Sequence, residues 1–238
     1  MTITIQHFFD PDTSTFSYVV SDPRTSEAAV IDSVLDYDQD AGRTSTKGAD
    51  TIIDYIREKN LKPVWIMDTH VHADHLTASG YIQEQLGGKT VIGDHIKDVL
   101  NFWIPLFNIA DDTPRDGSQF DVLLGDGEVL KLGNIEIKAI NTPGHTPACM
   151  CYLIEDAVFV GDTLFMPDVG TARVDFPGGD AAVQYDSIQR ILSLPDETRL
   201  FMCHDYPPAG REVTHMTTVA EEKKNNILIN QNISREEY

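Results

Sequence analysis

The feature that most constrains the fold is a set of strand-like segments that each end in a loop bearing histidine or aspartate. The second half of the chain contains "EVLKLGNIEIKAINTPGH", "ACMCYLIEDAVFVGDTL" and "TRLFMCHDY", and the earlier apolar stretch "PVWIMDTH" ends in the same way. Because strands deliver their terminal residues to one edge of a sheet, such loops can converge on one point although they lie far apart in the sequence. The pattern predicts a layered α/β fold with a polar site at one edge.

The remaining segments predict strands and helices that complete such a fold. The segments "TITIQHF", "FSYVVS" and "EAAVIDSV" have strand length and are separated by proline-containing turns, which predicts a meander. Apolar spacing and stop signals predict helices over 49–60, 76–88 and 181–194, with a polar loop over 35–50. We expect one domain over residues 1–238, in which residues 94–120 are an inserted segment beside the pocket.

Charge and hydropathy argue against two classes of partner. The chain has 18 Lys and Arg residues against 38 Asp and Glu residues, a net charge of −20, so we expect no nucleic-acid partner. Apolar runs long enough to span a bilayer are missing from the sequence, so we expect no membrane partner. The N-terminal residues do not resemble a secretory signal, and three cysteines are too few for a disulfide framework. These observations predict a cytoplasmic protein.

The densest polar cluster is "THVHADH", in which three histidines and an aspartate fall within six positions. Further histidines or aspartates follow in "NTPGHTP", "VFVGDTL" and "MCHDY". Imidazoles and carboxylates are costly to bury in an ordinary core, and together they suit zinc, iron or manganese. The sequence therefore predicts a metal centre formed by His70, His72, Asp74, His75, His145, Asp162 and His204. The isolated His7, His95 and His215 are interpreted as exposed or hydrogen-bonded residues outside it.

In this order, "THVHADH", "PGHT", "GDTL" and "HDY" resemble the motifs of the metallo-β-lactamase superfamily over nearly the whole chain. Within it, the likeness is closest to persulfide dioxygenases related to the ethylmalonic-encephalopathy protein, which carry TH-x-HADH, PGHTPG and R-T-D-F. This chain has "PGHTPA" and "RVDF", and so departs from that pattern at Ala148 and Val174. The resemblance implies an αββα sandwich, in which two mixed β-sheets are flanked by helices and the metal site lies at one edge.

The resemblance also implies roles for the metal-site residues. His70, His145 and Asp162 would bind one Fe(II) per chain, as a two-histidine, one-carboxylate set that leaves sites open for sulfur, water and O₂. Iron is favoured because zinc has no accessible redox change with which to activate dioxygen. The alternative to a single iron is Zn²⁺ or a dinuclear metal site. The remaining residues would orient the ligands and water or form a second metal site: His72, Asp74, His75 and His204.

The reaction implied by the resemblance is oxidation of glutathione persulfide by O₂ to sulfite, with release of glutathione. Because glutathione is anionic and the protein is acidic, local cations are expected at the site. Arg173 is our first candidate for holding a substrate carboxylate, with an ion pair to Asp175 as the alternative. Arg43 and Tyr206 are further candidates for the pocket, and Asp32 is expected to orient a ligand or cap a loop.

The inserted segment 94–120 leaves two interpretations open. Its aromatic residues Phe102, Trp103 and Phe107 either form a wall of the pocket or pack between subunits. The second interpretation predicts a homodimer.

Two other functions compete with the dioxygenase. A glyoxalase II-type thioester hydrolase would use two metals, with His70, His72 and His145 at one, Asp74, His75 and His204 at the other, and Asp162 between them. Ala73, which follows the second histidine of the motif, matches the dioxygenase pattern instead. A non-catalytic metal-binding sulfur-carrier partner would be indicated by loss of a ligand, but all seven positions are filled.

Overall fold

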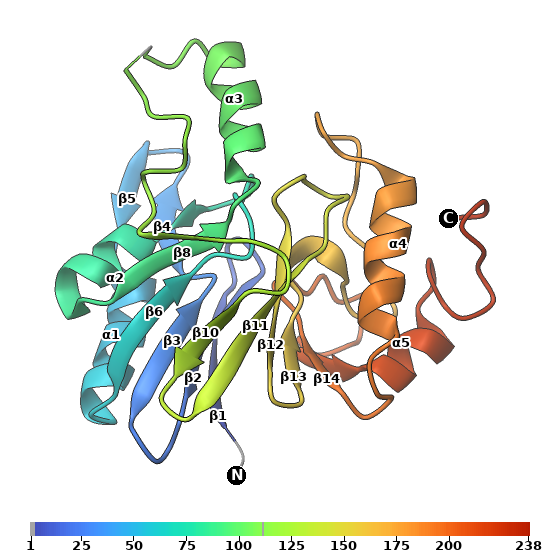
Figure 1. The fold of residues 1–238 in the computed structure, drawn as a ribbon, viewed down its shortest axis with the longest axis horizontal. Helices are drawn as coiled ribbons and strands as arrows, with labels where there is room; N and C mark the ends of the chain where they lie inside the picture. Colours follow the sequence, from blue (N-terminus) through green and yellow to red (C-terminus); the bar gives the residue numbers. More distant parts are fainter. Residues whose placement is uncertain (1–2, 111) are drawn as a thin grey trace.

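Two six-stranded β-sheets stack face to face, and helices cover their outer faces (Figure 1). The structure, a computed structural model, describes residues 3–110 and 112–238. Apolar clusters fill the space between the sheets and the space between each sheet and its helices. The four layers confirm the αββα arrangement expected from the sequence.

The first sheet contains the N-terminal strands and is flanked by two helices. β1, β2 and β3 form the predicted antiparallel meander, and β3, β6, β8 and β9 then run parallel to one another. The strands are β1 (Thr4–Asp10), β2 (Thr15–Ser21), β3 (Glu27–Ile31), β6 (Lys62–Met67), β8 (Lys89–Gly93) and β9 (Val122–Leu124). The helices are α1 (Lys47–Glu58) and α2 (Ser79–Leu86). α1 buries the apolar face that predicted it, including Ile52, Ile53 and Ile56.

The second sheet is antiparallel except where β13 and β14 run parallel, joined by the crossover helix α4. Its strands are β10 (Val129–Leu132), β11 (Ile135–Asn141), β12 (Met150–Ile154), β13 (Ala157–Phe159), β14 (Arg199–Phe201) and β15 (Met216–Thr218). The helices on its outer face are α4 (Ala181–Leu192), close to the predicted range, and α5 (Val219–Asn225). Both sheets are therefore mixed, as expected.

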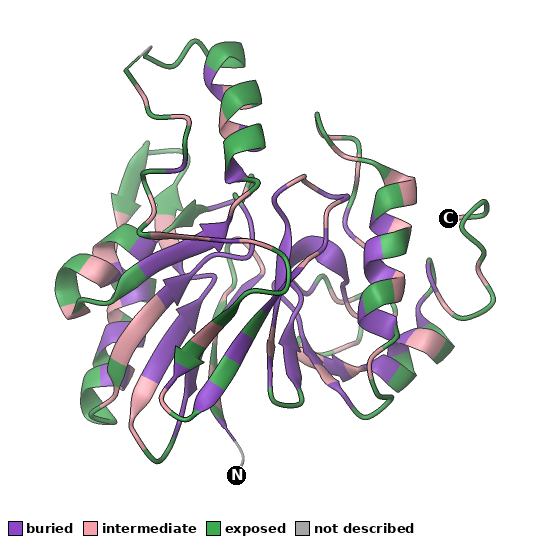
Figure 2. Cartoon of the chain, viewed as in Figure 1, coloured by how far each residue is buried: buried purple, intermediate pink, exposed green. Residues whose placement is uncertain are grey.

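The strands in the middle of the molecule are mostly buried (Figure 2), and large apolar side chains form the core between the two sheets. Tyr18 and Tyr152 are fully buried there, and each satisfies its hydroxyl with a backbone carbonyl. The Tyr152 hydroxyl donates to the carbonyl of Asp68 at 2.8 Å. This bond ties the second sheet to the residues that immediately precede the "THVHADH" motif.

The polar stretch 35–50 was expected to be a loop, and this expectation is wrong. It contains most of β4 (Val34–Asp38) and all of β5 (Arg43–Ser45), and β4 pairs with both β5 and β7 (Leu76–Thr77) in a small third sheet. The predicted helix over 76–88 consequently starts only at Ser79. Val34 is buried and Leu35 packs against the apolar cluster under α1, but the strands are short and mostly polar, so hydrophobic periodicity gave no sign of them.

Most of α3 (Ile96–Leu106) projects from the edge of the first sheet (Figure 1). It lies in the segment 94–120, of which residue 111 is outside the described residues. Its inward side packs Ile96 and Val99 against Ile92 and Ala148. In residues 3–110 and 112–238, no helix is long and apolar enough to cross a membrane, and this includes α3.

Glu222 on α5 is a fully buried carboxyl that accepts a hydrogen bond from the Asn226 amide at 2.6 Å. Burial, reinforced by the nearby Asp168 and Glu221, raises the pKa of Glu222 from 4.5 to about 8. The folded protein thus favours the protonated carboxyl. The stabilising contribution of Glu222 is greatest below its ordinary pKa and is lost as the pH rises towards 8.

We expect Glu222→Gln, which is neutral at every pH and keeps an acceptor for Asn226, to remove this loss. The free energy of unfolding in urea should be similar for the two proteins at about pH 5 and higher for the variant by ~4 kcal/mol at about pH 9. Parallel pH profiles for the two proteins would contradict a buried, proton-binding Glu222.

Candidate metal centre

The seven side chains predicted to form a metal centre lie together at one edge of the two sheets. They come from the segments that follow β6, β11, β13 and β14, so the predicted convergence of strand ends is what the structure shows. They fall into two groups. The triad group is His70, His145 and Asp162, and the second group is His72, Asp74, His75 and His204. Within each group, the candidate donor atoms lie within 4.8 Å of one another.

The triad group is buried and is organised around the Asp162 carboxylate. Asp162 Oδ2 lies 3.8 Å from His70 Nε2 and 3.6 Å from His145 Nε2. All three residues are less than 10% exposed. Two imidazole nitrogens and one carboxylate oxygen therefore face a common point.

The second group adjoins the triad group through the other oxygen of Asp162. Asp162 Oδ1 lies 3.4 Å from His204 Nε2, and Asp74 Oδ2 lies 3.5 Å from the same nitrogen. His72 belongs to this second group, whereas the hydrolase interpretation placed it with His70 and His145. Asp162 is thus positioned between the two groups.

Unpaired polar atoms show that these residues fit a metal. Among the described residues, most of the buried side-chain atoms without a hydrogen-bond partner are in the centre: Nε2 of His70, His75 and His204, Nδ1 of His72, and Oδ1 of Asp162. Leaving a buried donor or acceptor unpaired is unfavourable by ~1–3 kcal/mol per group. A divalent cation would satisfy these atoms, because neutral imidazole and carboxylate are its usual ligands.

Hydrogen bonds behind the triad group fix which nitrogen of each ring carries the proton. The Thr69 hydroxyl donates to Asp32 and can therefore accept from His70 Nδ1, 3.0 Å away. His145 Nδ1 donates to the main-chain carbonyl of Arg173 at 2.7 Å. With Nδ1 protonated, the Nε2 lone pair of each ring is left for a metal. Burial, followed by the neighbouring His72, lowers the pKa of His70 to about 3, so its imidazole is neutral at neutral pH.

Asp32, expected to orient a ligand, lies behind both groups. Its carboxylate accepts from the Thr69 amide at 2.7 Å and lies 3.2 Å from His72 Nε2. Asp32 follows β3 and has a φ of 51°, an unusual backbone conformation for a residue other than glycine. Its position holds His72 with Nδ1 directed into the centre, as the unpaired state of that atom indicates.

Thr15 is a residue of the centre that the sequence did not reveal. Its hydroxyl lies 3.2 Å from His204 Nδ1 and 3.5 Å from His75 Nδ1, and its backbone forms an isolated bridge with His204. A threonine at the start of an apolar strand carries no motif signal, because His204 is 189 positions away.

Arg173 and Tyr206 line a hollow of about 530 Å³ that opens onto Asp162 and His145. The Arg173 side chain is exposed and forms an ion pair with Asp175, which is the alternative that the sequence left open. Tyr206 stacks on the His204 ring with centroids 5.7 Å apart. Burial, together with Asp162 and Asp74, raises the pKa of Tyr206, so its hydroxyl stays protonated at neutral pH. Arg43 lies instead on β5, in a separate hollow with Tyr37 and Asp40.

A second cavity, of about 330 Å³, reaches the centre from below α3. Trp103 and Phe107 line it and stack on one another with centroids 5.1 Å apart. His72, Ala73 and His145 form its side towards the centre. Trp103 and Phe107 of segment 94–120 therefore form part of the wall of this cavity, which is one of the two interpretations that the sequence left open.

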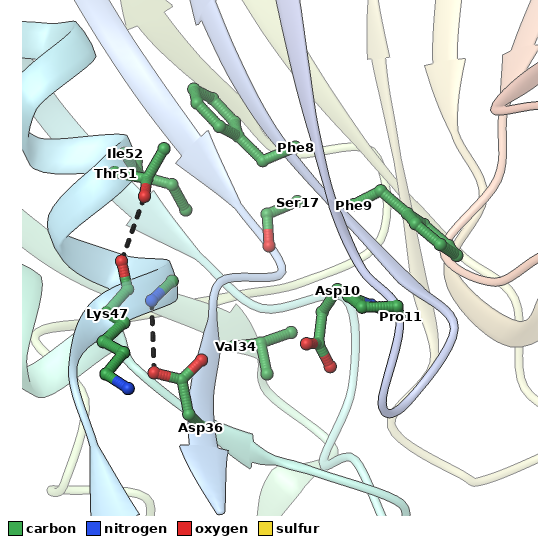
Figure 3. A pocket seen from close by; sticks show the side chains of 11 residues that line it. Phe8, Phe9, Asp10, Pro11, Ser17, Val34, Asp36, Lys47, Thr51 and Ile52 are labelled. Atoms are coloured by element: carbon green, nitrogen blue, oxygen red, sulfur yellow. Dashed lines mark hydrogen bonds between the residues drawn. The ribbon is translucent and has the colours of Figure 1, made fainter.

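A hollow of about 400 Å³ lies between β1, β4 and α1 (Figure 3), and its described lining does not include the seven side chains of the centre. Its polar groups are largely committed to local structure: Asp36 accepts from the Gly48 amide, and the Thr51 hydroxyl donates to the Lys47 carbonyl. Residues of the triad group are not among the described residues that line it.

The isolated histidines lie outside the centre, as interpreted from the sequence. His7 and His215 stack on each other with ring centroids 3.8 Å apart, and His95 pairs with Asp98 on the surface.

We expect His145→Ala to lose most of the metal bound by the wild-type protein, because it removes one of the three triad donors. Metal content measured by mass spectrometry should fall at least about tenfold. His95→Ala, which removes an exposed histidine, is the matched control and should keep the wild-type content. An unchanged metal content in a folded His145→Ala protein would show that the triad group is not the primary site.

Comparisons with known proteins identify the family of the chain. The sequence profile of the metallo-beta-lactamase superfamily matches residues 10–204. A probable metallo-hydrolase of Burkholderia pseudomallei is 48% identical over 99% of this chain and 84% of its own length. Glyoxylase B2 of Dictyostelium discoideum is 45% identical, over 98% of this chain and 81% of its own.

Persulfide dioxygenases are also among the relatives. The human mitochondrial persulfide dioxygenase ETHE1 is 29% identical over 86% of this chain and 69% of its own length. The crystal structure of ETHE1 from Myxococcus xanthus superimposes with a TM-score of 0.76 and 33% identity, covering 100% of this chain and 88% of that one.

Proposed function

The chain belongs to the metallo-β-lactamase superfamily, and within it we propose that the protein is an Fe(II)-dependent persulfide dioxygenase. The reaction consumes a persulfide, O₂ and water, and yields a thiol, sulfite and two protons. Four electrons pass from sulfur to O₂, and the sulfur–sulfur bond breaks. Glutathione persulfide is the first substrate to test.

The triad group is the observation that carries this proposal. His70 Nε2, His145 Nε2 and the Asp162 carboxylate form a two-histidine, one-carboxylate set, which is the ligand set of Fe(II) oxygenases with open coordination positions. The similarity to ETHE1 in Homo sapiens and Myxococcus xanthus supports the same interpretation. Ala73 after the second motif histidine also fits the dioxygenase pattern.

His70, His145 and Asp162 would hold the iron, with the second group beside it. Bound Fe(II) would supply the redox chemistry that O₂ activation requires and open positions for the two reactants. The chain's own contribution begins with the Thr69 hydroxyl and the Arg173 carbonyl, which keep both histidines in the tautomer that presents Nε2.

The walls of the site confine the reactants. Phe165, Phe176 and Tyr206 line the hollow that opens onto Asp162, and their rings limit the water around the reacting sulfur. Tyr206 keeps its proton at neutral pH and can donate a hydrogen bond to an anionic oxygen. Because a persulfide ionises readily, the chain does not need a strong general base at this site.

A dinuclear thioester hydrolase of the glyoxalase II type is the second candidate, and the second group favours it. His75 Nε2, His204 Nε2 and His72 Nδ1 are unpaired and buried in the described structure, as expected if another metal bound there. The names of the Burkholderia and Dictyostelium relatives point in the same direction. In that reaction, Asp162 would lie between two metals that activate water.

One preparation assayed in two ways separates the candidates. We expect about one iron per chain, O₂ uptake that depends on glutathione persulfide, and sulfite as the product. Asp162→Asn should abolish this uptake, because it weakens the single anionic ligand of the triad. Two zinc ions per chain with cleavage of a glutathione thioester, and no O₂ consumption, would establish the hydrolase instead.

A further inference from the structure

We propose that the cavity below α3 binds an apolar group of the substrate, so that the preferred persulfides carry an alkyl or aryl group. The reaction assigned to this substrate rests on the proposed function, whereas the binding preference can be measured without it.

The lining of the cavity is almost entirely apolar. α3 contributes Val99, Leu100, Trp103 and Ile104, and the segments that follow it contribute Phe107 and Ile109. The opposite wall is formed by Val71, Pro147, Phe176 and Pro177. With a volume of about 330 Å³, the cavity has the size and the lining of a small-molecule site. Apolar surface placed there leaves water and gains favourable free energy in proportion to the area buried.

The cavity is continuous with the candidate metal centre. His72, Ala73 and His145 line it, and Ala73, His145 and Phe176 also line the hollow that opens onto Asp162. A sulfur atom at the triad group therefore has an apolar space directly beside it. This continuity identifies the occupant as the group attached to the reacting sulfur.

Charge argues against a peptidic group such as glutathione in the same space. Among the described residues that line the cavity, none is a lysine or arginine. Arg173 lies three positions before Phe176, which forms part of the cavity wall. Its guanidinium is paired with Asp175, and its Cζ lies 4.9 Å from the centroid of the Phe176 ring. The chain as a whole carries a net charge of −20. The carboxylates of glutathione would thus lose water without gaining a cation, which disfavours their burial.

The test uses Trp103 as a reporter. Trp65→Phe removes the other tryptophan of the chain, whose indole donates to the Lys131 carbonyl far from the cavity in sequence. Butanethiol and glutathione are then titrated against the full chain and followed by Trp103 fluorescence. Both probes carry a thiol, so any sulfur–metal contribution is common to the two. We expect butanethiol to bind at least about tenfold more tightly than glutathione.

Two exposed phenylalanines on α3 or at its C-terminal end give matched variants. Phe107 is 65% exposed and lines the cavity, whereas Phe102 is 47% exposed and is not among its lining residues. We expect Phe107→Lys to abolish the preference for butanethiol and Phe102→Lys to preserve it. Equal effects of the two variants, or tighter binding of glutathione by the parent protein, would overturn the proposal. It would also be overturned if the fluorescence varied with protein concentration alone, since a second copy would then cover α3.

Oxygen uptake separates this inference from the proposed function. We expect kcat/KM to be about tenfold higher for butyl persulfide than for glutathione persulfide. If butanethiol binds as expected but neither persulfide supports O₂ uptake, the cavity assignment stands and the dioxygenase is wrong. If glutathione persulfide is oxidised and butanethiol fails to bind, the dioxygenase stands and the apolar substrate class is wrong.

Discussion

The burial of imidazoles and carboxylates at one edge of two apolar sheets is the constraint on which the rest of the structure depends. Such groups are stable there only when each polar atom has a partner. The protein satisfies the outward-facing atoms itself, through Thr69 behind His70, Thr15 behind His204 and Asp32 behind His72. Within residues 3–110 and 112–238, the inward-facing atoms have no hydrogen-bond partner and are available to a cation. The fold thus supplies hydrogen-bond partners for the outward-facing atoms of the centre, and a bound metal would supply them for the inward-facing atoms.

The two sheets make this arrangement possible because they fix the loops at both sides of the centre. The loop after β6 comes from the first sheet, and the loops after β11, β13 and β14 come from the second. The Tyr152 hydroxyl joins the sheets at the carbonyl of Asp68, two positions before His70. Packing between the sheets therefore sets the separation between His70 and Asp162. The rigidity of an apolar core is used to hold a polar site.

Much of this could be predicted from the sequence because the signals were local. Apolar runs ending in "THVHADH", "PGH", "GDT" and "HDY" indicated both the strands and the residues at their ends. The β4–β5 hairpin was missed because its strands are short and mostly polar, so they show no hydrophobic periodicity. Thr15 was missed because its partner is distant in the sequence, and Arg43 was expected near the pocket because the hairpin that carries it away was not predicted. Contacts between distant segments decide these cases, and a single sequence does not encode them in a short pattern.

Residue 173 contributes to the site in two ways: its main-chain carbonyl accepts a hydrogen bond from His145, and its side chain makes separate contacts. The carbonyl is present whatever the residue, so the orientation of the histidine does not depend on the arginine side chain. That side chain lines the hollow that opens onto Asp162, where it meets Asp175 and Phe176. Under the proposed function, a change of residue at position 173 would alter the wall that a substrate meets, while His145 would keep its hydrogen-bond partner. Under the proposed function, substrate recognition and the orientation of this metal donor could therefore change independently at position 173.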